Sequence, residues 1–69
     1  MCRNIKKLRD PEQPATPEEV RSAALQYVRK VSGYRTPSRR NQAAFEQAIT
    51  EIAAATQSLL DQLAALSTQ

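Results

Sequence analysis

Apolar side chains recur at alternating steps of four and three residues through the C-terminal part of the chain. Such spacing places them on one face of a long helix. We therefore predict a helix over about residues 39–66, with Ser38 as its N-cap. The apolar row consists of Phe45, Ile49, Ile52, Thr56, Leu59, Leu63 and Leu66.

A second, shorter pattern predicts a helix over about residues 17–32. Thr16, followed three residues later by Glu19, has the spacing of a capping box, and Pro17 suits the first helical position. Gly33 can adopt the left-handed conformation that ends a helix. The apolar face of this helix consists of Val20, Ala24, Tyr27 or Val28, and Val31.

The short connection between the two helices makes them neighbours in space. The expected fold is therefore all-α, a two-helix antiparallel hairpin over residues 17–66 in a single small domain of residues 1–69. A basic arm, residues 1–9, and a proline-rich linker, residues 10–16, precede the hairpin.

The predicted helices differ in length, at about 24 Å and about 42 Å. The first helix then covers the second only to about Ala55, and a row of leucines extends past it. We expect Ile5 and Leu8 of the arm to fold back over part of this overhang and a second copy of the chain to cover the rest, giving a four-helix homodimer. The predicted interface consists of Leu59, Leu60, Leu63 and Leu66.

Charge is distributed unevenly along the chain. Residues 1–40 hold all ten basic residues and four acids, a net charge of +6, whereas residues 41–69 hold three acids and no base. This asymmetry fits an acidic partner for the first half, two copies meeting at opposite ends, or simply a solvated surface.

The sharpest candidate site is the end of the hairpin together with the arm. Arg39 and Arg40 occupy the first positions of the second helix, where acids are normally preferred. With the Ser38 cap and the free amides, they suit a phosphate or carboxylate. Alternatively, the arginines lie over the hairpin end and pair with acids of this chain or of a neighbouring subunit. The candidate anion-binding residues are Arg3, Lys6, Lys30, Arg35, Ser38, Arg39 and Arg40.

Catalytic and metal chemistry has little support in the sequence. The chain has no histidine, the commonest metal ligand and acid–base group, so we expect no metal, no cofactor and no enzymatic activity. Cys2 has basic neighbours that favour the thiolate, and a redox role competes with an incidental or packed cysteine. No apolar run is long enough to cross a bilayer and no secretory signal is evident, so we expect a cytoplasmic protein.

Several segments resemble a family of short bacterial proteins that is catalogued only as a domain of unknown function. They are MCRNIK at the start, QPATPEEVR, AALQYVRKVSGYRTPS, and N-x-x-AFE before an alanine- and leucine-rich end. The resemblance covers about residues 1–63 and implies a small cytosolic bacterial protein. It implies no activity, ligand or catalytic residue.

The pattern as a whole favours a small non-enzymatic interaction protein. Its arm and hairpin end would contact an anionic partner, with nucleic acid as the first candidate and an acidic protein as another. The alternative is a protein–protein adaptor that uses the leucine overhang, with the basic charge serving only for solubility.

Overall fold

A computed structural model describes residues 7–10 and 12–67 of the chain. Its first helix, α1 (Pro17–Ser32), has the predicted bounds. The backbone N–H of Glu19 donates to Oγ1 of Thr16 at 3.1 Å, and the backbone N–H of Thr16 donates to Oε1 of Glu19 at 2.9 Å. The capping box is therefore confirmed, and it satisfies two amides that the helix leaves unpaired.

The second helical segment begins differently from the prediction. A single 3₁₀ turn, η1 (Arg39–Asn41), precedes α2 (Gln42–Ser67), so regular α-helix starts three residues later than expected. The side chain of Ser38 makes no capping hydrogen bond, which corrects its predicted role. The backbone carbonyl of Ser38 accepts from the N–H of Asn41 at 3.0 Å, the bond that closes the tighter turn.

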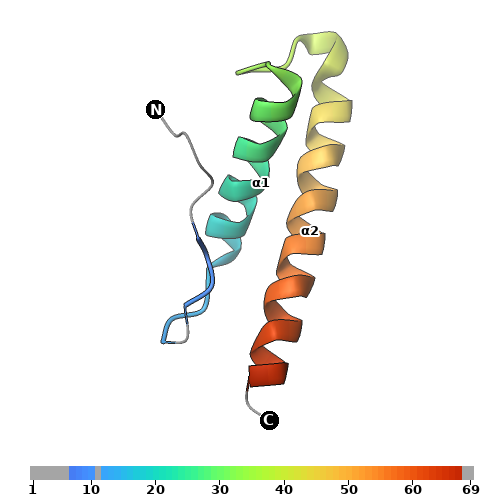
Figure 1. The fold of residues 1–69 in the computed structure, drawn as a ribbon. Helices are drawn as coiled ribbons and strands as arrows, with labels where there is room; N and C mark the ends of the chain where they lie inside the picture. The colour runs from blue at the N-terminus through green and yellow to red at the C-terminus, as the bar shows by residue number, and fades with distance from the viewer. Residues whose placement is uncertain (1–6, 11, 68–69) are drawn as a thin grey trace.

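The two long helices pack against each other, and in the described part of the chain every regular element is helical. Figure 1 shows α1 and α2 side by side, joined at one end by residues 33–38. The core lies between them. Ala24 and Val28 of α1 pack with Phe45 and Ile49 of α2, and the partly buried side chains around this cluster are Leu25, Ala48, Ile52 and Ala53.

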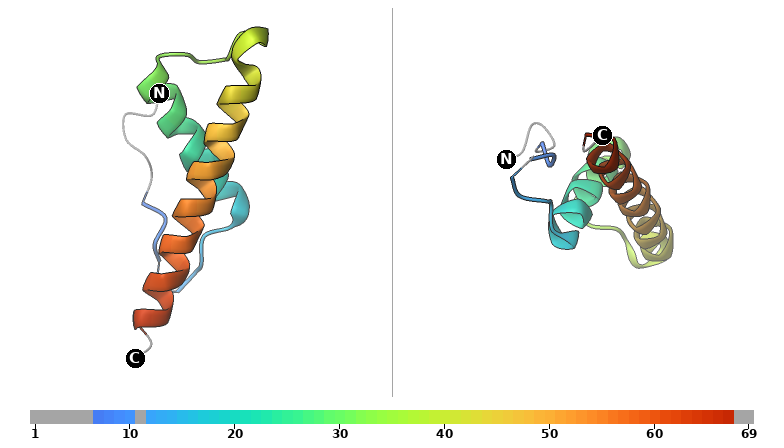
Figure 2. Two further views of the ribbon diagram at one scale, coloured as in Figure 1. Left: turned by 90° about the vertical axis from the view of Figure 1, so that its right-hand side faces the viewer. Right: turned by 90° about the horizontal axis from the view of Figure 1, so that it is seen from below.

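The helices diverge toward the connection. Figure 2 shows them crossing at an angle, with the connection bridging a wider separation than exists farther along α2. Val31 is 64% exposed there, although its position in the sequence places it on the apolar face of α1. The expectation that Val31 packs in the hairpin is wrong, because near the connection α2 is no longer close enough to cover it.

As the helix lengths predict, the C-terminal part of α2 extends past the end of α1. Only some of the leucines in this overhang are exposed. At about 1.5 Å per residue, α1 spans about 24 Å and α2 about 39 Å. Beyond Ala53, no described residue of α2 is fully buried. Leu59 and Leu66 are 55% and 67% exposed, whereas Leu60 and Leu63 are half-buried within the single chain.

The part of the arm that the structure describes lies at the level of this overhang. In Figure 1, residues 7–10 run beside the N-terminal end of α1, at the height of the C-terminal half of α2. Leu8 is half-buried, and its packing over the overhang stays a prediction. Ile5, the other apolar residue assigned to that role, lies outside the described residues.

Gly33 ends α1 in the left-handed conformation, as expected. Its φ is 80°, and its N–H donates to the carbonyl of Arg29 at 2.9 Å. A Cβ added there would meet no atom within 4 Å, so the cost of substitution is conformational.

We expect Gly33→Ala to lower the free energy of unfolding by about 1–2 kcal/mol. Gly33→Asn should cost less, since asparagine tolerates this region, and urea unfolding of the two variants makes the comparison. Equal losses would contradict the conformational explanation.

Candidate functional site

Five basic residues lie in the last turn of α1, in the connection and in η1, at one end of the molecule. We call this set the basic tip, and all five members are exposed. The sequence contains no acid between Glu19 and Glu46, so no acidic residue lies within this segment. The basic tip consists of Arg29, Lys30, Arg35, Arg39 and Arg40.

Two backbone features bring these residues to one end. Gly33 stops α1 immediately after the turn that carries Arg29 and Lys30. The N–H of Tyr34 then donates to Oγ of Ser32 at 3.1 Å, which fixes the exit of the chain from the helix. Because only five residues separate Gly33 from η1, Arg39 and Arg40 lie at the same end of the molecule.

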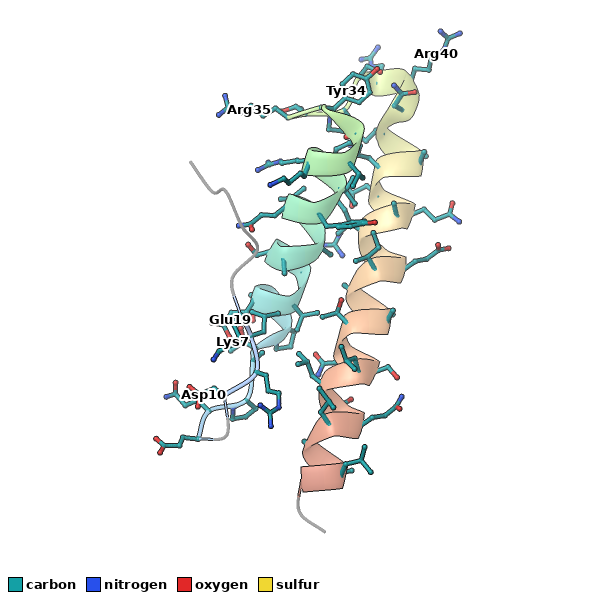
Figure 3. All side chains as sticks on the ribbon, viewed as in Figure 1. Lys7, Asp10, Glu19, Tyr34, Arg35 and Arg40 are labelled. Atoms are coloured by element: carbon teal, nitrogen blue, oxygen red, sulfur yellow. The ribbon has the colours of Figure 1, made fainter. Side chains whose placement is uncertain are left out.

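The arginines of the basic tip do not converge on one point. Figure 3 shows Arg35 and Arg40 extending toward opposite sides of the tip. The Ser38 side chain makes no cap bond at the start of η1. The positive potential of the tip is therefore spread over a broad surface. Such a surface suits a ligand with several spaced negative charges better than a single phosphate.

Arg21 is the one basic residue between Glu19 and Glu46 that lies outside the tip. Its Nη2 lies 2.9 Å from Oε1 of Glu46 and connects α1 to α2. The two side chains are about half exposed, so this pair contributes little stability, on the order of 0.2–1 kcal/mol. Among the acids of this chain that could pair with a tip arginine, Glu46 thus pairs with Arg21 instead.

The sequence-predicted residues of the arm cannot be placed beside the tip. Arg3, Lys6 and Cys2 lie outside the described residues. Of the predicted anion-binding set, the structure brings together Lys30, Arg35, Ser38, Arg39 and Arg40.

A second candidate surface follows one side of α2. Ala48, Ile52, Ala55, Leu59 and Leu66 lie at helical spacing along it, and we call them the apolar strip. Ala55, Leu59 and Leu66 are exposed, while Ala48 and Ile52 are half-buried at the edge of the core. Sequence reasoning assigned Leu59 and Leu66 to an interface with a second copy, but it grouped them with Leu60 and Leu63 and did not identify the strip as a separate surface.

The strip exists because a straight α-helix does not repeat every seven residues. Each heptad falls about 20° short of two full turns, so Leu66 is rotated about 60° from Phe45. Leu60 and Leu63 accordingly lie on the same side of α2 as Phe45 and Ile49 and are half-buried, and Leu59 and Leu66 turn aside into solvent.

Other side chains in the described region have structural roles. Oγ1 of Thr56 donates to the carbonyl of Ile52 at 2.7 Å, which satisfies this hydroxyl within the preceding turn of α2. Residues 7–10 and 12–67 contain no cluster of three or more metal-ligating side chains. None of the helices in these ranges combines the length and the apolar character that crossing a bilayer requires.

Comparison with known proteins identifies one family. The family model of an uncharacterised conserved protein, DUF2277, matches residues 1–68, which is nearly the whole chain. No curated protein and no solved structure matches the chain.

Proposed function

The chain belongs to the DUF2277 family, and we propose that it is a small non-enzymatic interaction protein that binds nucleic acid through its basic tip. The observation that carries this proposal is the uninterrupted positive charge of the tip, with five exposed cations and no acid in the segment that holds them. The arm residues Arg3 and Lys6 would extend the same contact. Such a protein would act in the cytoplasm and need neither metal nor cofactor.

The spread of the tip arginines favours a polyanion over a small ligand. Arg35 and Arg40 extend in opposite directions, so one phosphate cannot contact both, whereas successive phosphates of a nucleic acid can (Figure 3). Phosphate contacts by flexible cations give affinity without sequence specificity. We therefore expect binding that depends on charge and strand geometry more than on base sequence.

We further propose that the hairpin is antiparallel and acts as a homodimer in a four-helix arrangement. The short connection and the packing of Ala24 and Val28 on Phe45 and Ile49 support the antiparallel arrangement. The exposure of Leu59 and Leu66 supports the dimer, since burying each leucine is favourable by about 1.5–3 kcal/mol. In the dimer, two basic tips would act together on one nucleic acid.

Fluorescence anisotropy with a labelled DNA duplex, and with one of its strands, tests the proposal. Binding should weaken steeply between about 50 mM and about 200 mM salt. Arg35→Ala, Arg39→Ala and Arg40→Ala should each reduce the slope of log affinity against log salt by about one. Arg21→Ala is the matched control, because it removes the same charge from a residue that already pairs with Glu46.

Two results would reject nucleic-acid binding at the tip. The first is an unchanged anisotropy at low salt for both probes. The second is a loss for Arg21→Ala as large as that for the tip variants, which would indicate a response to net charge alone.

The exposed leucines also support a second candidate, a protein–protein adaptor. In that role, the apolar strip would hold a different protein and the basic tip would only aid solubility. The purified chain would then be monomeric, and tip variants would bind the protein partner as well as the wild type does.

A further inference from the structure

The two helices of the hairpin differ in how their ends are charged. In α1, Glu18 and Glu19 occupy the first turn and Arg29 and Lys30 the last, as the helix dipole favours. In α2, the first turn holds no acid and the last turn no base. Arg39 and Arg40 stand immediately before α2, so its fixed charges and its dipole have the same polarity.

This polarity gives α2 an electropositive beginning and an electronegative end. Two such helices side by side attract each other when they run in opposite directions and repel when they run in the same direction. A second copy of this chain, with its α2 reversed, would place a basic tip beside the last turn of the other α2, which contains no basic residue.

The side chains of the apolar strip favour the same orientation. The N-terminal half of the strip carries the small residues Ala48 and Ala55 on either side of Ile52, and the C-terminal half carries Leu59 and Leu66. A reversed copy sets large residues against small ones, as close packing requires. One register satisfies two contacts at once: Leu59 lies opposite the partner's Ala48, and Ile52 lies opposite the partner's Ala55.

We propose that two copies pair through the apolar strips of antiparallel α2 helices, with Arg40 of each copy at the C-terminal end of the other copy's α2. This inference rests on the homodimer of the proposed function and specifies its interface. In the register above, Arg40 falls at the level of position 67 of the partner, within the last turn of α2. Figure 3 shows Arg40 extending outward from the hairpin, where a neighbouring molecule can reach it.

A charge reversal with its rescue tests the contact. Arg40→Glu should weaken dimerisation about tenfold in sedimentation equilibrium, because two symmetric attractions become repulsions. Adding Ala65→Lys to Arg40→Glu should restore dimerisation, since the new lysine meets the partner's Glu at position 40. Within one chain, the two positions are about 38 Å apart along the helix, so the rescue must act between copies. Arg35→Glu, with the same change of charge but a side chain on the other side of the tip, is the control.

A distance measurement tests the orientation independently. In a Cys2→Ser background, a spin label on Gln42→Cys should lie about 35 Å from its counterpart along the axis of an antiparallel pair. A parallel pair would bring the two labels to the same level.

Three outcomes would overturn the inference: a monomer at all concentrations, labels at the same level, or an Arg40→Glu defect that Ala65→Lys does not rescue. A monomer that still binds DNA through its tip would refute the interface and leave the proposed binding standing. A dimer with the expected label distance that binds no DNA would support the interface and refute the proposed binding of nucleic acid.

Discussion

Replacing Phe45 with alanine should abolish cooperative folding of the chain. Phe45 is the largest buried side chain among the described residues, and it packs against Ala24, Val28 and Ile49. A buried phenylalanine truncated to alanine costs about 3–5 kcal/mol. A single core in a chain this short rarely supplies more than about 3–5 kcal/mol, so the loss matches the whole stability of the hairpin.

Circular dichroism during urea titration measures this effect. We expect a gradual, non-sigmoidal loss of helix in Phe45→Ala. Val31→Ala is the control, because Val31 is also an apolar residue but is exposed. Its truncation should change the free energy of unfolding by less than about 0.5 kcal/mol. A sigmoidal transition of Phe45→Ala within about 1 kcal/mol of the wild type would show that the core lies elsewhere.

The double variant Leu59→Glu and Leu66→Glu should be monomeric and should keep its helices. Both side chains are more than half exposed in the single chain, so glutamate at these positions meets water when the chain is alone. In the dimer, glutamate at position 59 would be buried against the partner's Ala48 and would weaken association at least about 100-fold. Light scattering gives the mass and circular dichroism the helix content.

Thr50→Glu with Ala54→Glu provides a matched control for charge. Both positions are exposed, lie on α2 and are outside the apolar strip, so the pair should remain dimeric. Dissociation of this control would mean that added negative charge alone separates the copies. A Leu59 and Leu66 double variant that keeps the dimer mass would exclude the strip as the interface.

Local signals in the sequence predicted the boundaries of α1 well. The capping box of Thr16 and Glu19 and the left-handed Gly33 each act within a few residues, and the structure has both. The start of the second helix was less predictable. The turn after Ser38 is 3₁₀ and not α, and this depends on how the connection spans the distance between the two helices. No local pattern in the sequence specifies that distance.

Burial along each helix was harder to predict than its extent. The row from Phe45 to Leu66 has coiled-coil spacing, but α2 follows the period of a straight helix, so Leu59 and Leu66 leave the face that contacts α1. Val31 matches the apolar period of α1 and is nevertheless exposed, because the crossing angle removes its neighbour.

The charge of the tip was visible in the sequence, but its geometry was not. The run of bases without acids from Arg29 to Arg40 predicts a positive end once the hairpin is assumed. The opposite directions of Arg35 and Arg40 depend on the path of the connection (Figure 3).

The central claim is that α2 extends past the end of α1 and that a second copy of the chain covers its exposed leucines. Sedimentation equilibrium of the unmodified chain tests this claim most directly. We predict a mass of twice 7.7 kDa at high concentration and a melting temperature that rises with concentration. A mass of 7.7 kDa at every concentration, with cooperative unfolding that does not depend on concentration, would contradict the account.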